Sequence, residues 1–268
     1  MKYTTKDVCK IFNITRETLR YYEKKGIIQP EISSENNYRY YDDWDINFIG
    51  ECKKYQSLDF SLKEIHNIFA RGSLNDYINN LEEKQAEFEN KLRFYTLLTE
   101  KNKHYIQKLK SIPDYLEKYS ITESPSYYHL IARKNFEYDL STSTLENTYI
   151  ALKNYAFYDH TVFINKEDYQ DSNDNFYWCM SIENYLVDKL NIPLDNMFFM
   201  PSQTCIHTII DAGERWNFGC HLFKGMVEYA EKNGYEMNGP IYGLLLTRVY
   251  HNDKYCRYLD VYLPVKKK

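Results

Sequence analysis

The longest uninterrupted pattern in this chain is a heptad seam, and it limits what the rest of the chain can fold into. From Leu74 to Leu109 the seam positions alternate between spacings of four and three residues, with no proline or glycine before Ser111. At about 1.5 Å per residue, one helix over this stretch is on the order of 55 Å long, more than a small core needs. We therefore expect a partner along its length, in a homodimeric coiled coil. The seam consists of Leu74, Ile78, Leu81, Gln85, Phe88, Leu92, Tyr95, Thr99, Asn102, Ile106 and Leu109.

A long amphipathic helix packed inside a monomer is the alternative, and the charged residues beside the seam argue against it. Gln85, Thr99 and Asn102 are polar seam positions. Polar residues there help to fix the register and the number of helices in the coil, and they add little to its stability. The pattern alone allows a parallel or an antiparallel coil. The charged flanks are Glu82, Glu83, Lys84, Glu87, Glu89, Lys91, Glu100, Lys101 and Lys103. We assign the dimer contact to Leu81, Phe88, Leu92, Tyr95 and Ile106.

The first seventy residues contain a helix-turn-helix pattern. Thr4 and Asp7 have the spacing of a capping box at the start of a short helix. Asn13 follows that helix and tolerates the left-handed conformation that such a turn needs. Thr15 can cap a second helix, in which Leu19 and Tyr22 can pack inward. Its outward positions carry the basic residues Arg16, Arg20, Lys24 and Lys25. A solvated helix face is the plain alternative for these charges, and the motifs around the helix favour a nucleic-acid contact instead.

A small β-wing and two more helices are expected after the second helix. Residues 26–30 leave it in extended conformation, and residues 35–41 have the pattern of a wing tip with its return strand. Asp42 with Asp45 can cap a helix to about Leu58, and Ser61-Leu62-Lys63-Glu64 is a capping box for the next. The predicted order is helix, turn, helix, wing, helix, helix.

These residues resemble the MerR family of bacterial transcriptional regulators. The resemblance is carried by Leu-Arg-Tyr-Tyr at 19–22, Asn-Tyr-Arg-x-Tyr at 37–41 and Phe-Ser-Leu-x-Glu-Ile at 60–65, and it covers residues 3–69. The family usually has glycine where this chain has Asn13, Asn37 and Asp59. All three are short residues that accept turn conformations, so the backbone expectation survives.

The resemblance implies contacts with double-stranded DNA from the second helix and the wing. We assign groove contacts to Arg16 and Tyr21, and contacts with phosphates, or support of those contacts, to Arg20, Tyr22, Lys24, Tyr38 and Arg39. It also implies an antiparallel dimer on a pseudo-palindromic promoter, whose distortion lets RNA polymerase read both promoter elements. The formal net charge of the whole chain is −4, which speaks against a non-specific nucleic-acid coat.

The C-terminal part is rich in strands and aromatic residues, and we expect two unequal copies of a strand, helix, strand, strand unit. The first copy comprises 127–133, 142–156, 161–166 and 176–183, and the second 203–210, 216–233, 241–247 and 257–265. The predicted fold is multidomain α+β. Its parts are a winged helix-turn-helix at 1–72, a coiled-coil helix at 73–112, a linker at 113–125 and an α+β effector-binding domain at 126–268.

The second copy resembles the effector domain of the multidrug-sensing, BmrR-like branch of the MerR family, a fold shared with gyrase-inhibitor-like proteins. Gly213 before an amphipathic helix, Asn-Gly-Tyr at 233–235, Gly-Pro at 239–240 and Tyr-Leu-Pro-Val at 262–265 carry this resemblance. Relatives of this branch usually place a glutamate three residues after the Gly-Pro, where this chain has Gly243. Either another carboxylate replaces it or the effector is neutral.

Strand alternation predicts where an effector would bind. Tyr177 and Glu183 lie on one face of their strand, and Tyr258, Asp260 and Tyr262 lie opposite the apolar face of theirs. If the apolar faces pack under the helices, these aromatic and acidic faces line a shared cleft. Ring faces and a buried carboxylate suit a flat aromatic molecule, neutral or cationic. With 28 tyrosines in the chain, most are ordinary half-buried strand residues. The predicted ligand residues are Tyr149, Tyr177, Glu183, Trp216, Tyr258, Asp260 and Tyr262.

Cysteine usage points away from metal sensing. Cys9, Cys52, Cys179, Cys205, Cys220 and Cys256 include no Cys-x-x-Cys and none lies in the long helix or just after it. We expect them to act as small hydrophobic residues in a reducing compartment, and we expect no metal and no cofactor. No signal peptide and no long apolar run is present, which predicts a cytoplasmic protein without a membrane contact.

Two other classes of protein compete with the regulator. A hydrolase is conceivable on the gyrase-inhibitor-like fold, with Glu183 and Tyr262 as candidates, but the sequence shows no nucleophile and base pair, so we expect no catalytic residue and no enzyme. A multidrug-binding or sequestering protein would explain the C-terminal part and leave the winged helix without a role.

Overall fold

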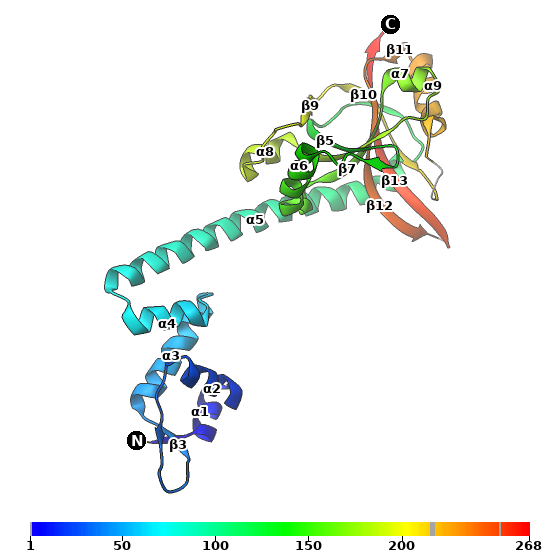
Figure 1. The fold of residues 1–268 in the computed structure, drawn as a ribbon. Helices are drawn as coiled ribbons and strands as arrows, with labels where there is room; N and C mark the ends of the chain where they lie inside the picture. The colour runs from blue at the N-terminus through cyan, green and yellow to red at the C-terminus, as the bar shows by residue number, and fades with distance from the viewer. Residues whose placement is uncertain (1, 215–217, 252) are drawn as a thin grey trace. The chain divides into compact units, whose positions relative to one another are not determined.

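The computed structural model describes residues 2–214, 218–251 and 253–268. They form two compact units, which divide between Tyr95 and Thr96. The chain is multidomain α+β, with a winged helix-turn-helix, a long helix and a sheet-rich C-terminal domain (Figure 1).

The N-terminal unit has the predicted element order. Its helices are capped where the sequence indicates, because the side chains of Thr4, Thr15, Asp42 and Ser61 each accept a hydrogen bond from the backbone N–H three residues on. The described elements are β1 (Tyr3–Thr4), α1 (Thr5–Phe12), α2 (Arg16–Lys24), β2 (Glu31–Ile32), β3 (Arg39–Tyr41), α3 (Asp43–Ser57) and α4 (Leu62–Arg71).

Three positions where glycine was the expected residue have left-handed backbones. Asn13, Asn37 and Asp59 have φ values of 50°, 55° and 60°. Asparagine and aspartate are the non-glycine residues that enter this region most readily, so the turn and the wing keep their geometry. The prediction at these positions is confirmed.

The core of the N-terminal unit joins α1, α2, α3 and α4. Val8, Leu19, Ile49 and Ile65 are fully or almost fully buried in it. Removing one such side chain from water contributes about 1.5–3 kcal/mol. Tyr22 belongs to the same core with no exposed surface, and its hydroxyl donates to Gln56 Oε1 at 3.2 Å.

Helix α5 (Leu74–Tyr115) is longer than predicted. The expected end at residues 111–113 is wrong, because Pro113 lies inside the last turn and Leu116 N–H bonds to Ile112 O at 2.9 Å. Proline removes one donor, and the backbone bonds on either side of it hold the turn together. The expected linker also contains a strand, β4 (Ser120–Glu123), which pairs with β10 (Thr204–Asp211).

The C-terminal unit contains the two predicted copies. In the first, β5 (Tyr127–Lys134), α6 (Thr142–Lys153), β7 (Asp159–Ile164) and β8 (Tyr177–Glu183) follow one another. The second has β10 (Thr204–Asp211), α9 (Lys224–Lys232), β12 (Ile241–His251) and β13 (Lys254–Lys267).

The two copies meet in the middle of one sheet. Among the described residues this sheet has ten strands, with the central order β10-β13-β12-β7-β8-β5. The second strands of the two copies, β12 and β7, pair antiparallel, with Tyr242 opposite Phe163. Each copy therefore mirrors the strand order of the other. Smaller elements complete the unit: β6 (Glu137–Tyr138), a 3₁₀ turn (Tyr155–Phe157), α7 (Lys166–Gln170), α8 (Asn184–Leu190), β9 (Phe198–Met200) and β11 (Tyr235–Met237).

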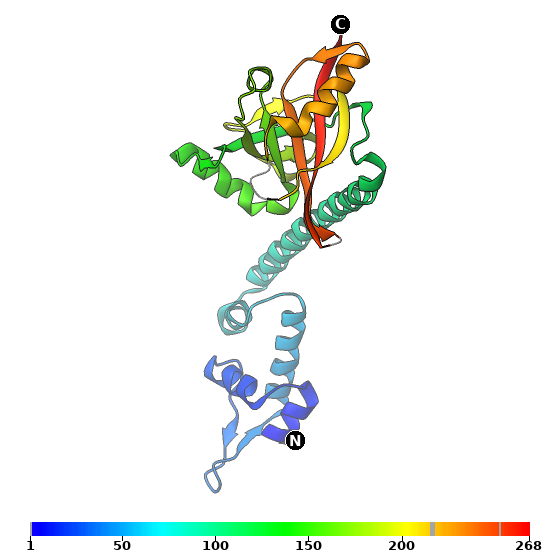
Figure 2. The same ribbon diagram turned by 90° about the vertical axis from the view of Figure 1, so that its right-hand side faces the viewer.

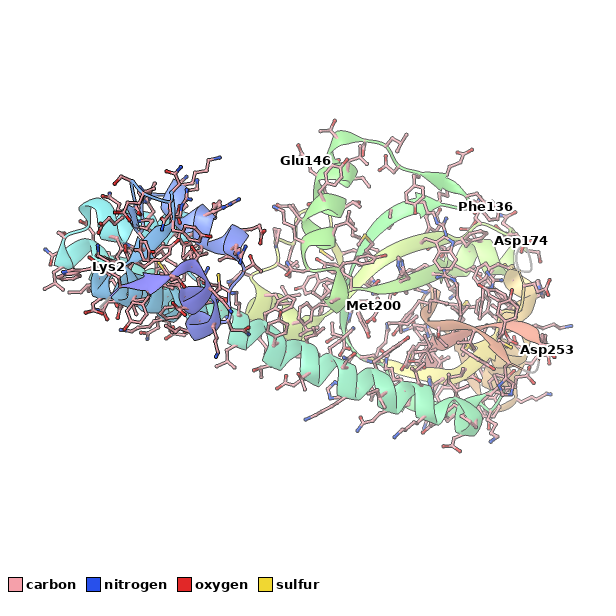
Figure 3. The ribbon with its side chains drawn as sticks, turned by 90° about the horizontal axis from the view of Figure 1, so that it is seen from below. Lys2, Phe136, Glu146, Asp174, Met200 and Asp253 are labelled. Carbon is pink, nitrogen blue, oxygen red and sulfur yellow. The ribbon has the colours of Figure 1, made fainter. Side chains whose placement is uncertain are left out.

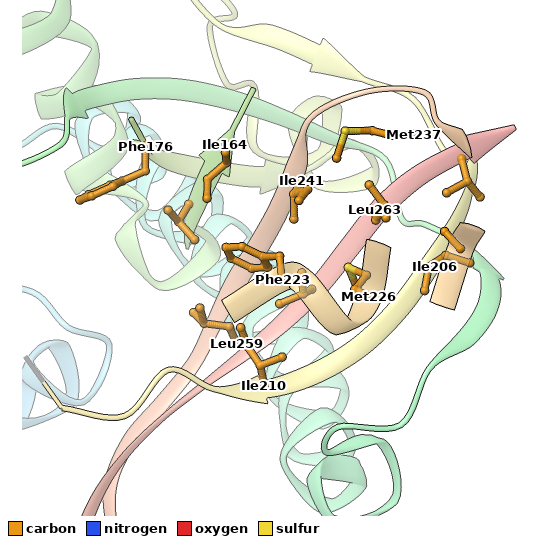
Figure 4. Close-up of a cluster of buried hydrophobic side chains, with 14 of the residues drawn as sticks. Ile164, Phe176, Ile206, Ile210, Phe223, Met226, Met237, Ile241, Leu259 and Leu263 are labelled. Atoms are coloured by element: carbon orange, nitrogen blue, oxygen red, sulfur yellow. The ribbon is translucent and has the colours of Figure 1, made fainter. Parts of the chain in front are cut away.

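One face of this sheet is covered by α9. Figure 2 shows that helix, in orange, lying over the yellow and red strands β10 and β13. Phe223, which directly precedes α9, and Met226 of α9 pack against Ile206, Leu259 and Leu263, as Figure 4 shows. Leu259, Val261, Leu263 and Val265 all contribute to this core, so the predicted apolar face of the last strand is confirmed.

The second helix starts later than the predicted residue 216. Residues 215–217 lie outside the described part, and a 3₁₀ turn (Cys220–Phe223) precedes α9. Cys220 N–H bonds to Asp174 Oδ1 at 3.0 Å and its thiol donates to Asn173 O at 3.4 Å. These bonds hold Cys220 against a loop of the first copy. The α-helix therefore begins only at Lys224.

Candidate DNA-binding surface and effector site

The second helix of the N-terminal unit presents a basic, exposed face. Arg16, Arg20 and Lys24 are exposed, and the ring of Tyr21 is 42% exposed. Lys25 Nζ lies 5.5 Å from the centre of that ring, a cation–π distance. This face can reach phosphates and base edges, because none of these groups is needed in the core.

The wing is fastened to this helix by one carboxylate. Glu23 Oε2 accepts from Arg39 Nε at 2.9 Å, and Glu23 Oε1 accepts from the Tyr41 hydroxyl at 2.6 Å. Burial, and next the bond to Glu23, raise the pKa of Tyr41, so this hydroxyl stays a donor. Tyr38 at the wing is 65% exposed. Arg39 therefore positions the wing in addition to any phosphate contact, and the buried Tyr22 can act on DNA only through its packing.

In the C-terminal unit, Asp260 and Tyr262 lie together with a basic residue on each side. Asp260 is buried, and its oxygens meet His207 Nε2 at 2.6 Å, Lys108 Nζ at 3.1 Å and the Tyr262 hydroxyl at 3.2 Å. Burial alone would raise the pKa of Asp260. The His207 bond and the Lys108 charge outweigh it, and the pKa is lowered.

Glu183 belongs to a second, neighbouring group of charges. Lys101 Nζ lies 2.6 Å from Asp159 Oδ2 and 4.0 Å from Glu183 Oε1. The Tyr127 hydroxyl also reaches Asp159, at 3.4 Å. Lys101 and Lys108 both come from α5, and Tyr105 between them donates to the backbone oxygen of Leu246.

The acidic face is therefore covered by α5 and is not the open cleft that alternation predicted. The Lys101 side chain is buried, which corrects its assignment to a solvated flank of the coil. A cavity of about 400 Å³ remains beside Lys101, Asn102, Tyr105, Tyr158 and Asp159. That volume suits a small organic molecule.

The structure leaves the other predicted ligand residues dispersed. Tyr149 is 61% exposed on α6, while Tyr177 stacks with Lys134 and Tyr258 lies opposite Asp211. Trp216 lies outside the described residues. The groups that sequence reasoning missed are Lys101, Lys108, His207 and Asp159. The seven-residue spacing of the two lysines, two turns of one helix face, was the signal that could have pointed to them.

The predicted seam of α5 is largely exposed in the single chain. Leu74, Ile78, Phe88 and Ile106 are 73%, 43%, 37% and 49% exposed. Leu92 and Tyr95 are also more than half exposed, and Leu81 is half-buried against the N-terminal core. Exposed large side chains in one stripe are typical of a helix that has a partner in solution.

In the described part of the chain, no group of three or more His, Cys, Asp or Glu residues is placed to hold a metal ion. None of its helices has the length and apolar character that a membrane span requires.

The fold and this surface define a winged-helix DNA-binding regulator, and comparisons with known proteins identify its family. The model of the MerR HTH family regulatory proteins matches residues 3–72. The HTH-type transcriptional regulator CueR of Salmonella typhi is 30% identical over 110 residues, which are 41% of this chain and 73% of CueR. The chain belongs to the MerR family.

Other similar proteins match over shorter parts. The multidrug-efflux transporter 2 regulator of Bacillus subtilis (strain 168) is 29% identical over 90 residues, 34% of this chain and 33% of that protein. For CueR of Escherichia coli O157:H7 the identity is 36% over 58 residues, 22% of this chain and 43% of CueR. The chain thus spans less than half the length of these two relatives.

Solved structures also resemble the chain at low identity. The EcmrR–DNA complex has a TM-score of 0.37 at 17% identity, over 99% of this chain and 100% of that one. A hydrolase from Listeria innocua has a TM-score of 0.40 at 10% identity, over 60% of this chain and 97% of that one.

Proposed function

We propose that this chain is a ligand-responsive transcriptional regulator that binds a pseudo-palindromic promoter as a homodimer. The carrying observation is the exposed basic face of α2, with the wing fixed beside it through Glu23 and Arg39. Winged helices read DNA with such a helix in the major groove and a wing against the backbone. Arg16 and Tyr21 are the proposed groove contacts, with Arg20, Lys24, Tyr38 and Arg39 on phosphates.

The exposed seam of α5 supports the homodimer. Ile78, Phe88 and Ile106 recur on the seam and are exposed in one chain, so a second copy would bury them. A dimer doubles the basic footprint, which a chain of net charge −4 needs for tight binding. We propose that the dimer distorts its promoter DNA, so that RNA polymerase can read both promoter elements.

The proposed effector is an aromatic molecule, neutral or cationic, bound beside the acidic face of the C-terminal unit. Asp159, Glu183 and Asp260 supply three carboxylates there, against the two ammonium groups of Lys101 and Lys108. These five groups leave one negative charge, and Glu183 has the longest ion-pair distance, 4.0 Å. Arg248 also borders the cavity beside Lys101. A cation at Glu183 would compete with Lys101, so binding would act on α5. Such coupling typically amounts to about 1–3 kcal/mol.

Operator binding is the first test. Genomic fragments recovered with the purified protein supply the DNA, and fluorescence anisotropy gives the affinity. Arg16→Ala should weaken specific binding by roughly tenfold or more, since a good bidentate base contact contributes about 1–3 kcal/mol. Lys53→Ala, an exposed charge on α3, is the matched control. If Arg16→Ala and Lys53→Ala weakened DNA binding equally, Arg16 would attract DNA only through its charge and would make no specific base contact.

Transcription in vitro then separates the regulator from its alternatives. An activator raises transcription with effector while operator affinity stays nearly constant. Release of DNA by the effector would identify a repressor, and binding of ligand without any DNA shift would identify a sequestering protein. Glu183→Gln should remove the response to a cationic effector and keep DNA binding.

A further inference from the structure

A row of arginines crosses the C-terminal sheet on β13, β12 and β5. Arg257 on β13 is the direct cross-strand partner of Arg248 on β12. Like charges directly opposite in an antiparallel pair are destabilising. Arg257 shares its face with Leu259, whereas Asp260 points to the other face, because side chains alternate along a strand. Arg133 on β5 pairs with Trp178 on the far side of the sheet centre.

The three guanidinium groups have no ion pair with a carboxylate among the described residues. Arg133 stacks on Trp178 at 4.9 Å and on Tyr138 at 5.5 Å. Arg257 donates to the backbone oxygens of Ala212, Gly213 and Glu214 at 2.9, 2.6 and 2.7 Å. Arg248 is exposed.

The positive field of this row acts on a neighbouring histidine. Burial, and after it the charge of Arg248, lower the pKa of His160. Asp159 opposes this effect, and Arg133 adds to it. The His160 Nε2 atom lies 2.6 Å from the Tyr155 hydroxyl.

Two cavities meet at these arginines. One is about 390 Å³ and the other about 270 Å³, and Arg133, Trp178 and Arg248 line both. The second also has the rings of Phe136, which Figure 3 labels, Phe176 and Phe218, with Phe176 and Phe218 5.0 Å apart. No described residue lining either cavity is an acid. Arg248 also borders the cavity beside Lys101, whose Asp159 is already paired with Lys101.

We propose that this double cavity binds an aromatic anion, a planar ring system with a carboxylate, sulfonate or phosphate group. The rings of Trp178, Phe176 and Phe218 cover the apolar part, and the forks of Arg133 and Arg248 bind the anionic group. Guanidinium matches such oxyanions with two parallel hydrogen bonds, and a stacked arginine is already held in place. A bound anion also relieves the repulsion between Arg248 and Arg257. This site lies beyond the proposed function, since its ligand has the opposite charge preference.

Three probes of one shape test the charge preference on the full-length protein: 2-naphthoate, 2-naphthamide and 2-naphthylmethylammonium. Calorimetry should give 2-naphthoate an affinity at least about tenfold above the neutral amide, in line with a charge-assisted pair. The cation should bind this site more weakly than the amide. Equal affinity of the three probes would overturn the proposal.

Variants locate the site. Arg248→Gln should bring 2-naphthoate down to the affinity of 2-naphthamide and should raise the melting temperature of the free protein, because a like-charge pair is removed. Arg133→Gln should also lower the affinity for 2-naphthoate, and it replaces Arg248→Gln as the test if that variant does not fold. Lys134→Gln removes a neighbouring exposed charge that stacks on Tyr177 and should leave the affinity unchanged. If Lys134→Gln weakens 2-naphthoate as much as Arg248→Gln, the anion binds to general positive charge and the site assignment is wrong. No outcome here bears on DNA binding.

Discussion

Replacing Asp260 by asparagine should destabilise the C-terminal unit. The carboxylate is 3% exposed and holds Lys108, His207 and Tyr262. Removing one partner of a buried ion pair typically costs about 3–5 kcal/mol. Here the loss is smaller, because asparagine keeps an acceptor oxygen and Lys108 also feels Asp159 and Glu183. We expect about 2–3 kcal/mol, a fall in melting temperature of roughly 5–10 °C for a unit of this size.

The pH dependence supplies an independent check of the same pair. The folded-state pKa of Asp260 lies below its ordinary value, so the carboxylate contributes stability above that ordinary value. This stability is lost as the pH falls through the folded pKa. The asparagine variant should therefore lose less stability than the natural protein between neutral and strongly acidic pH.

Thermal and denaturant unfolding measure both effects, with Asp195→Asn as the control at an exposed carboxylate. Asp195→Asn should change the melting temperature by no more than surface substitutions usually do. If Asp260→Asn matched that control at neutral pH, the buried ion pair would contribute nothing and the covering of the acidic face by α5 would need another explanation.

Three further predictions concern the other contacts. Leu92→Asp places a charge at the centre of the seam and should abolish dimerisation and DNA binding together, while a dimer in sedimentation would refute the seam. Arg39→Ala should weaken all DNA sequences alike and flatten the salt dependence, and an unchanged salt slope would exclude the wing from the contact surface. Lys101→Met removes the counter-ion of Asp159 and Glu183. In calorimetry this variant should bind 2-naphthylmethylammonium roughly tenfold more tightly than the natural protein does, because the acidic face no longer holds a competing ammonium group. Unchanged affinity there would show that Lys101 does not compete.

The N-terminal unit could be predicted almost residue by residue because its signals are local. A capping box such as Thr4 with Asp7 spans one helical turn, and both the donor and the acceptor are visible in the sequence. The left-handed Asn13 is likewise a property of one residue type. Tyr22 was foreseen as both buried and close to DNA, and only the packing shows that its hydroxyl is used by Gln56.

The covering of the acidic face could not be predicted from the same kind of signal. Alternation places Asp260 and Tyr262 on one face, and it says nothing about which distant segment packs there. Lys108 and Asp260 are separated by more than half of the chain, and their contact depends on where α5 meets the sheet. The heptad pattern also misled, because Lys101 fits a charged flank of a coil as well as it fits a buried ion pair.

The missing glutamate at Gly243 follows from the packing around that residue. A Cβ atom there would lie 3.2 Å from Val261 Cγ2 and 3.7 Å from Val162 Cγ1, so even alanine is crowded. A glutamate would have to enter the apolar core under α9 without a partner, at a cost of several kcal/mol. Selection of effector charge must therefore come from elsewhere in this domain. The acidic face satisfies most of its own charge through Lys101 and Lys108. The guanidinium groups of Arg133, Arg248 and Arg257 form no ion pair with a described carboxylate. If one site of this domain discriminates strongly by charge, we expect it to be the arginine row, because its guanidinium groups are not held in ion pairs with described carboxylates.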